Sequence, residues 1–217
     1  MSAFTSFVQH SQGNPPPPPA AHDYPSRSLS KGDTLYHLGD DASAVYHVEE
    51  GLLKLSLDLL SGRERIVSIV GPGDYLGAIT PLHHTYQESA EALSPRVRVS
   101  VLPKEQQGIQ DALHAASGLY LTRLRDALED TDLPVNARLA RAFLRLGQRF
   151  GHTSEEGQVR LTLPLTHDNF AAMVGAARET TTATLGEMRD EGVISGTRGR
   201  YSFDQGELTD FAVSASF

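Results

Sequence analysis

Hydrophobic and polar residues alternate in short runs over the first half of the chain, from Leu29 to Pro103. The runs have the period of two that a half-buried strand requires, and they cover residues 46–48, 52–59, 65–70 and 97–102. Gly-Asp pairs and single glycines separate the runs, as expected of turns. Several short strands with regular turn signals are typical of an all-β barrel or jelly roll, which we predict over residues 29–104.

The second half of the chain changes to a helical period. Residues 105–131 carry an apolar stripe wide enough to pack on the β domain and on a partner helix. Packing within one subunit is the alternative for this long helix. Pro134 follows in a hinge at 132–134, and the apolar positions of the next segment predict an amphipathic helix over 135–151.

Two short helical runs meet at a glycine near the C-terminus. Phe170, Met173 and Val174 form an apolar face at helical spacing before Gly175 supplies the permissive backbone of a tight turn. Two helices joined by a short turn around Gly predict a helix-turn-helix, with an ordinary packed helix pair as the alternative. The second run opens with residues suited to reading bases: Arg178, Glu179 and Thr180.

A hairpin is predicted after this motif. Val193 and Ile194 lead into a turn at 196–199, and residues 200–203 return as the second strand. A hairpin in this position is the wing of a winged helix. Arg198 and Arg200 at its tip are placed for phosphate contacts.

The segment 165–194 resembles the DNA-binding motif of the cyclic-AMP receptor protein and fumarate-nitrate regulator (CRP/FNR) superfamily, whose usual pattern is LTxxxxAxxVGxxRETVxRxLxxLxxxGxI. The chain matches this pattern at Leu165, Thr166, Ala171, Val174, Gly175, Arg178, Glu179, Thr180, Leu185, Gly192 and Ile194. KGDTLYHLGD, VYHVEEGLLKL and SGRERIVSIVGPGDYLG are similar to the β-roll of the cyclic nucleotide-binding domain. The resemblance implies an α+β protein with an N-terminal β-roll, a long dimerisation helix over 105–131 and a winged helix-turn-helix domain over 132–217.

The resemblance also implies a homodimeric transcription regulator that binds a palindromic operator and contacts RNA polymerase, as an activator more often than a repressor. Arg178 is then expected to pair with guanine and Glu179 with cytosine, which predicts a TGTGA-like half-site. Ala183 replaces a second base-reading Arg and relaxes one position of that half-site. Further candidate DNA contacts are Thr166, His167, Thr180 and Thr182. The dimer interface is expected at Leu113, Ala116, Tyr120, Leu124 and Ala127.

The effector pocket implied by the resemblance has lost its key side chains. The phosphate-binding segment starts at Gly77, but Ala78 replaces the ribose-binding Glu, and Glu88 before Ser89 replaces the phosphate-binding Arg. A carboxylate about 5 Å from a phosphate costs about 3 kcal/mol at an effective dielectric of 20. We therefore expect no cofactor; cyclic AMP bound in a modified pocket remains the alternative. The other pocket positions are Ile79, Arg123 and Leu124, and Arg123 is hypothesised to pair with Glu88 of its own or the partner subunit.

The composition and charge of the chain exclude some kinds of site and bear on DNA binding and location. The chain has 217 residues, a formal charge of −8 and no Cys, which excludes disulfides and a Cys-ligated iron–sulfur cluster. The acidic charge predicts weak non-specific DNA binding. No apolar run has the length of a membrane span and no secretory leader is visible, so we expect a cytoplasmic protein without membrane partners.

Three weaker signals complete the sequence. Residues 1–28, with Pro15–Pro19, are expected to form a disordered leader, a docking tail for a Pro-binding partner being the alternative. His83 and His84 are expected to be solvated, so no metal site is predicted. No nucleophile–base pair or phosphate-gripping loop is visible, which argues against an enzyme. A ligand-sensing module with no DNA role is the remaining alternative.

Overall fold

The computed structural model describes residues 24–77, 84–103 and 109–216. These residues divide into two compact units. The first unit comprises the described residues up to Leu53 and from Val70 to Tyr120; the second comprises Lys54–Ile69 and the described residues from Leu121 onward. The predicted leader lies mostly outside the described residues.

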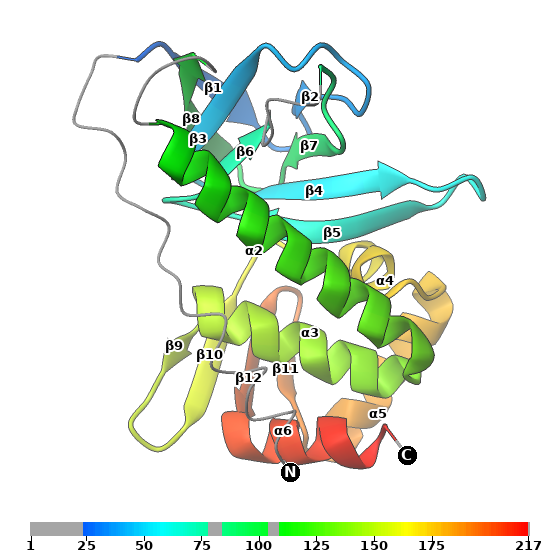
Figure 1. Ribbon diagram of the computed structural model, residues 1–217. Helices are drawn as coiled ribbons and strands as arrows, with labels where there is room; N and C mark the ends of the chain where they lie inside the picture. Colours follow the sequence, from blue (N-terminus) through cyan, green and yellow to red (C-terminus); the bar gives the residue numbers. More distant parts are fainter. Residues whose placement is uncertain (1–23, 78–83, 104–108, 217) are drawn as a thin grey trace. The chain divides into compact units, whose positions relative to one another are not determined.

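The N-terminal part of the chain folds into the predicted β-roll (Figure 1). Its first sheet has the strand order β1-β8-β3-β6, formed by β1 (Ser26–Ser30), β8 (Arg96–Pro103), β3 (Ala44–Glu50) and β6 (Tyr75–Gly77). Its second sheet has the order β2-β7-β4-β5, formed by β2 (Thr34–Tyr36), β7 (Ser89–Ala92), β4 (Leu53–Asp58) and β5 (Glu64–Val70). The all-β prediction is confirmed.

Alternating apolar residues form the core of the roll. β3 and β8 pair antiparallel with Val48 opposite Val99, and both side chains are fully buried. Successive strand residues point to opposite faces, so every second position of these strands enters the core. The predicted disordered leader is wrong at its C-terminal end, because β1 begins at Ser26. The sequence of β1 is mostly polar, and only Leu29 is buried. This strand is therefore defined by its backbone pairing with β8 rather than by hydrophobic residues.

A long helix follows the roll. α2 spans Ile109–Glu129 and continues as the short 3₁₀ helix η1 (Asp130–Asp132), which ends one residue beyond the range 105–131 predicted for one helix. After the hinge, α3 spans Val135–Phe150, and Pro134 is its N-cap residue. An extended Pro at this position ends the preceding helix, because its ring cannot continue the α2 hydrogen-bond ladder.

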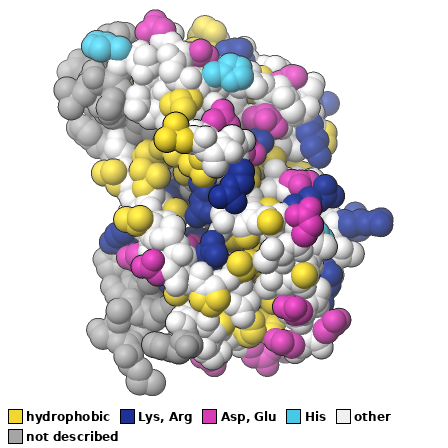
Figure 2. Space-filling view, turned by 90° about the vertical axis from the view of Figure 1, so that its right-hand side faces the viewer, with side chains coloured by type: hydrophobic (Ala, Val, Ile, Leu, Met, Phe, Trp, Pro, Cys, Tyr) yellow, Lys and Arg dark blue, Asp and Glu magenta, His cyan; other side chains and the backbone are white. Residues whose placement is uncertain are grey.

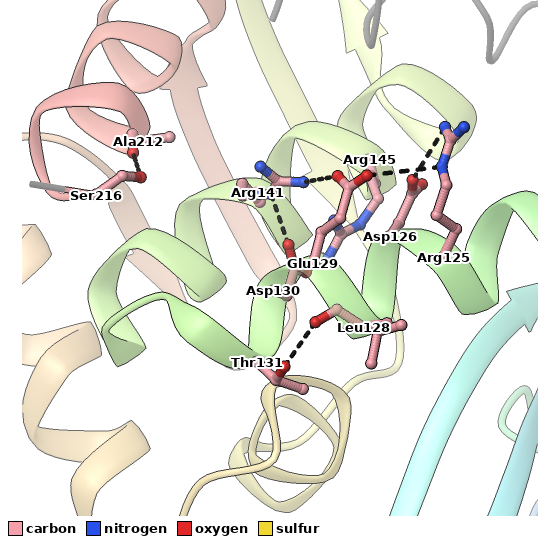
Figure 3. Close-up of polar contacts among 10 residues, drawn as sticks. All are labelled: Arg125, Asp126, Leu128, Glu129, Asp130, Thr131, Arg141, Arg145, Ala212 and Ser216. Carbon is pink, nitrogen blue, oxygen red and sulfur yellow. Dashed lines mark hydrogen bonds and ion pairs between the residues drawn. The ribbon is translucent and has the colours of Figure 1, made fainter. Parts of the chain in front are cut away.

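A buried ion network holds the hinge (Figure 3). The carboxylate of Asp130 is 3 % exposed; its Oδ1 lies 2.6 Å from Arg141 Nε, and its Oδ2 pairs with Arg145. Arg141 is itself buried and lies 3.5 Å from Glu129. Removing one member of such a buried network leaves an uncompensated charge, which costs about 3–5 kcal/mol. The network therefore ties the end of α2 to α3.

The C-terminal part is a winged helix-turn-helix, as predicted. Its elements are β9 (His152–Thr153), β10 (Gln158–Thr162), α4 (His167–Val174), α5 (Arg178–Asp190), β11 (Ser195–Thr197), β12 (Arg200–Asp204) and α6 (Gln205–Ser214). The sheet has the order β11-β12-β10-β9. Phe143 of α3 contacts Phe170, Tyr201 and Phe203, with ring centroids 5.0, 5.0 and 6.0 Å away. This aromatic core packs α4 and the wing on α3.

Candidate nucleic-acid interface and effector pocket

The first helix of the motif is capped at both ends. Thr166 Oγ1 accepts a hydrogen bond from the Asn169 backbone N–H, and Asn169 Oδ1 accepts one from the Thr166 N–H, at 3.2 and 2.9 Å. This capping box satisfies two donors at the start of α4. At the other end, Gly175 has φ 65° and ψ 39°, the left-handed conformation that glycine adopts without a Cβ penalty. The turn predicted at Gly175 is confirmed.

The second helix presents the predicted base-reading residues to solvent. Arg178, Glu179, Thr180 and Thr182 are exposed on α5. Its inner side contains Thr181 and Thr184, which are 0 % and 8 % exposed. Their hydroxyls donate to the backbone carbonyls of Ala177 and Thr180, four residues earlier, at 2.9 and 3.0 Å. These bonds allow threonine to stand in a packed face where an apolar β-branched residue is usual.

Two side-chain contacts join α4 to α5. His167 Nδ1 lies 3.0 Å from Thr182 Oγ1, and Asp168 Oδ1 lies 3.4 Å from Arg178 Nε. The first contact links two predicted DNA-contacting residues. The contact of Asp168 was not predicted. An acidic residue in the first turn of a helix is already explained by its favourable interaction with the helix dipole, so its sequence position gives no sign of a contact with Arg178.

The wing ends in a tight turn. Thr197 pairs with Arg200 across the hairpin, so Arg198 and Gly199 are the two turn residues, with φ 52° and 80°. Positive φ at both positions is the type I′ geometry, for which Asn or Gly is usual at the first position. Arg198 is thus held in a sparsely populated conformation with an exposed side chain, and Arg200 is exposed beside it.

The predicted effector pocket contains a buried carboxyl group. Glu88 is 0 % exposed, and its Oε1 accepts a hydrogen bond from Tyr36 Oη at 3.0 Å. The hydroxyl of Tyr120, on α2, also hydrogen-bonds Glu88. The Tyr36 ring stacks on Tyr86 with centroids 3.9 Å apart. Burial raises the pKa of Glu88 to about 7, although both tyrosine hydrogen bonds act in the opposite direction.

Other pocket positions have local roles. Ser89 Oγ accepts a hydrogen bond from the Leu38 N–H at 2.9 Å. Gly77 has φ 103°, and a Cβ there would lie 3.0 Å from the Ala44 carbonyl oxygen, so only glycine fits. Ala78, Ile79 and His83 lie outside the described residues.

Arg123 makes a contact that the sequence did not predict. Its guanidinium donates a hydrogen bond to Ser68 Oγ of β5, whereas hydroxyl groups meet the Glu88 carboxyl. Arg123 and Glu88 belong to different compact units, so their pairing within one subunit stays a hypothesis. A pair across two subunits also stays a hypothesis. Leu124 is half-buried on the same helix.

The α2 residues predicted to form the dimer interface are only partly exposed. Leu113 is 3 % exposed and packs within its own chain. Ala116, Tyr120, Leu124 and Ala127 are half-buried. Among the α2 side chains that the structure describes, Leu121 and Leu128 are large, apolar and exposed, at 65 % and 70 %. Leu121 was not predicted, although its spacing of seven from Leu128 is a recognisable heptad signal.

Two further observations concern only the described residues. No helix among them is long and apolar enough to cross a membrane. Within the same residues, no group of three or more metal-ligating side chains is present. The His47 ring contacts the Tyr75 ring, with centroids 4.9 Å apart.

Comparisons with known proteins agree with this architecture. Residues 26–107 match the cyclic nucleotide-binding domain and residues 137–206 match the Crp-like helix-turn-helix domain. Transcriptional regulator SdrP of Thermus thermophilus is 32% identical over 178 residues, covering 80% of this chain and 86% of that protein. A CRP-like cAMP-activated global transcriptional regulator of Mycobacterium tuberculosis is 29% identical, with 76% of this chain and 77% of that protein covered.

A solved structure extends the comparison to three dimensions. The crystal structure of a CRP/FNR-family transcriptional regulator from Thermus thermophilus has a TM-score of 0.73 and 29% identity, covering 88% of this chain and 100% of that one. The β-roll, the long helix and the winged helix-turn-helix thus occur together in a regulator of known fold. The chain belongs to the CRP/FNR superfamily and is a transcription regulator with a helix-turn-helix DNA-binding domain.

Proposed function

We propose that the protein binds a palindromic TGTGA-like operator as a homodimer and does so without cyclic AMP. The observation that carries the proposal is the buried Glu88 carboxyl, which stands where the phosphate-binding Arg of the cyclic nucleotide site is expected. Ionised, this carboxyl repels a cyclic phosphate; protonated, it offers no positive charge to bind one.

The hydrogen bonds of Glu88 support a function without effector. Tyr36 belongs to the roll and Tyr120 to α2, so the carboxyl joins the sensor strands to the long helix through the protein's own side chains. A bound nucleotide that bridges the same two elements is then unnecessary. These bonds support a regulator whose α2 takes its active arrangement without a ligand.

The operator assignment rests on α5. Arg178 and Glu179 are adjacent, exposed and in the first turn of the helix, where base-reading residues of such helices lie. An Arg suits the O6 and N7 atoms of guanine, and a carboxylate accepts from cytosine N4. A protein dimer with two-fold symmetry matches two inverted half-sites.

Transcription activation in the cytoplasm follows from this proposal. A dimer bound near a promoter offers a surface to RNA polymerase, and we assign the protein as an activator on the resemblance alone. The relatives are transcription regulators rather than enzymes, and we propose no catalytic activity for this chain.

The test is fluorescence anisotropy of the purified protein on a labelled TGTGA-N6-TCACA duplex at near-physiological salt, with and without cyclic AMP. We expect the same tight binding in both conditions, and about 1–3 kcal/mol lost in Arg178→Ala, with relaxed preference at its base. Arg160→Ala, on an exposed position of β10, is the matched control.

Each other outcome has a meaning. Binding that appears only with cyclic AMP would support the alternative of a modified nucleotide pocket and refute effector independence. Absence of binding to this and to scrambled duplexes in both conditions would refute the operator and favour a ligand-sensing role.

A further inference from the structure

A second cluster of charged residues lies at the helix-turn-helix turn, within the second compact unit. Arg65 of β5 reaches Gly175 so closely that a Cβ on that glycine would lie 1.9 Å from Arg65 Nη1. Arg138 Nη1, from α3, lies 3.8 Å from the same point. Two guanidinium groups from separate elements therefore converge on one turn.

The charges of these arginines are not balanced locally. Arg138 Nη1 donates to the Val174 carbonyl oxygen at 2.6 Å, which is a neutral partner. Among the described residues, no carboxylate forms an ion pair with Arg65 or Arg138. Asp130 attracts Arg65, but it already pairs with both Arg141 and Arg145. Two positive charges at the turn remain without a paired anion in this part of the chain.

The side chains also retain unused donors. Nε of Arg138 and Nη1 of Arg145 are buried atoms without a hydrogen-bond acceptor in the described chain. Buried N–H donors are costly when unpaired, and they are usually satisfied by an acceptor. Burial, followed by the charge of Arg138, lowers the pKa of Arg65, and the charge of Arg145 acts in the same direction. The cluster is thus a half-buried cationic group with free donors.

We propose that Arg65, Arg138 and Arg145 form a binding site for a small phosphate-bearing anion. Guanidinium groups match the geometry of phosphate oxygens and bind them in a bidentate manner. A phosphate monoester carries about two negative charges at neutral pH, which matches the two unpaired cations. The Figure 2 view shows Lys and Arg side chains gathered among hydrophobic ones on one face of the molecule.

The position gives the site a regulatory consequence. An anion between Arg65 and Arg138 joins the β4–β5 hairpin of the sensor sheet to the turn between α4 and α5. Binding would then hold the helix-turn-helix in one arrangement relative to the hairpin. This consequence rests on the proposed DNA-binding function, whereas the site itself does not.

The experiment uses the full chain and inorganic phosphate as the probe. Calorimetric titration and thermal unfolding are measured in a zwitterionic buffer, with sodium chloride at matched ionic strength as the reference. We expect saturable binding of phosphate and a rise in the unfolding temperature that chloride does not produce. Arg65→Gln and Arg138→Gln should each weaken binding at least tenfold.

Two further variants keep the test decisive. Arg63→Gln, two residues away on the same hairpin and exposed, should bind phosphate as the wild type does. Arg65→Lys keeps the charge but loses the bidentate fork, and should fold normally and still bind more weakly. Wild-type protein that binds no phosphate, or Arg63→Gln that loses binding equally, would overturn the site.

DNA binding provides a separate readout. If phosphate binds but leaves operator affinity unchanged, the site stands and its regulatory consequence is refuted. If phosphate binds while no duplex does, the site stands and the proposed operator fails. The two proposals therefore fail independently.

Discussion

At the residue scale, Glu88 is a buried carboxyl group at the position where the resemblance implies the phosphate-binding Arg. Burying a charged carboxylate away from water costs free energy, so the environment of Glu88 favours the protonated form. The groups that face it are the hydroxyls of Tyr36 and Tyr120, and burial raises the pKa of both; that of Tyr120 is raised to about 12. Neither tyrosine ionises near neutral pH, so Glu88 alone titrates there.

The free energy of unfolding should therefore depend on pH through Glu88. Its pKa rises from 4.5 in the unfolded chain to about 7 in the folded one, so the folded state binds the proton more tightly. The stabilisation that the protonated Glu88 adds to the free energy of unfolding is fully present below pH 4.5 and is lost as pH rises through 7. We expect the wild type to lose about 3 kcal/mol relative to Glu88→Gln across this window.

Urea unfolding at a series of pH values measures this difference. The exposed Glu50→Gln variant is the control, and its pH dependence should follow the wild type. Parallel curves for the wild type and Glu88→Gln would show that the carboxyl does not carry a raised pKa.

At the residue scale, the exposure of a side chain on its own helix could be predicted from sequence. Arg178 and Glu179 were assigned from their place in the motif, and both are exposed as a base-reading role requires. Asp168 was missed because its contact with Arg178 crosses between helices. An acidic residue in the first turn of a helix looks the same in the sequence whether or not it contacts a neighbouring helix.

At the level of elements, α5 lacks a stabilising start. Its N-cap residue, Ala177, has the extended backbone of a cap at φ −69° and ψ 150°, but no side chain that accepts a hydrogen bond. The helix N-terminus thus keeps its first donors for solvent or another acceptor. Arg178 and Glu179 follow directly, so the missing cap lies beside the residues proposed to read DNA.

Replacing Ala177 with Ser should stabilise the protein. The backbone already has the N-cap conformation, and a hydroxyl there accepts a hydrogen bond from the second or third helical N–H. We expect a gain of about 1 kcal/mol in the free energy of unfolding, measured by chemical denaturation. Ala176→Ser, one residue before the cap, should produce no comparable gain; equal effects of both variants would contradict the capping explanation.

At the level of the whole molecule, α2 carries two large apolar side chains that are exposed to solvent. Leu121 and Leu128 lie seven residues apart, so they fall on one side of the helix, and both are mostly exposed. Exposed leucines in a heptad relation are typical of a helix that pairs with a second helix. They extend the proposed dimer interface toward the hinge.

Charge at these two positions should separate the subunits. Leu121→Asp and Leu128→Asp each place a carboxylate where the proposed dimer excludes water, at a cost of about 3 kcal/mol, or roughly a hundredfold in dimer dissociation constant. Analytical ultracentrifugation measures the dimer, and operator affinity should fall with it. Val213→Asp, an exposed apolar position on α6, is the control; a stable dimer in both α2 variants would place the interface elsewhere.

Local pattern was sufficient for the architecture of this protein. Alternation located the β-roll strands from 44 to 70 and from 96 to 103, and helical spacing with Gly175 located α4 and α5. These signals succeed because a strand or helix buries one face, and that face repeats at a fixed period along the chain. β1 has only Leu29 buried and gave no such signal, so no strand was predicted there and the β-roll was expected to begin at residue 29.

The partners of buried polar groups required the folded chain. Tyr36 meets Glu88 across 52 positions of sequence, and Arg65 of β5 meets the helix-turn-helix at Gly175. No periodicity relates such residues, because hydrogen bonds and ion pairs depend on side-chain direction after the sheets and helices have packed. Family, fold and the exposed residues at the start of α5 thus follow from sequence alone, whereas the hydrogen bonds of Glu88 and the arginine cluster follow from packing.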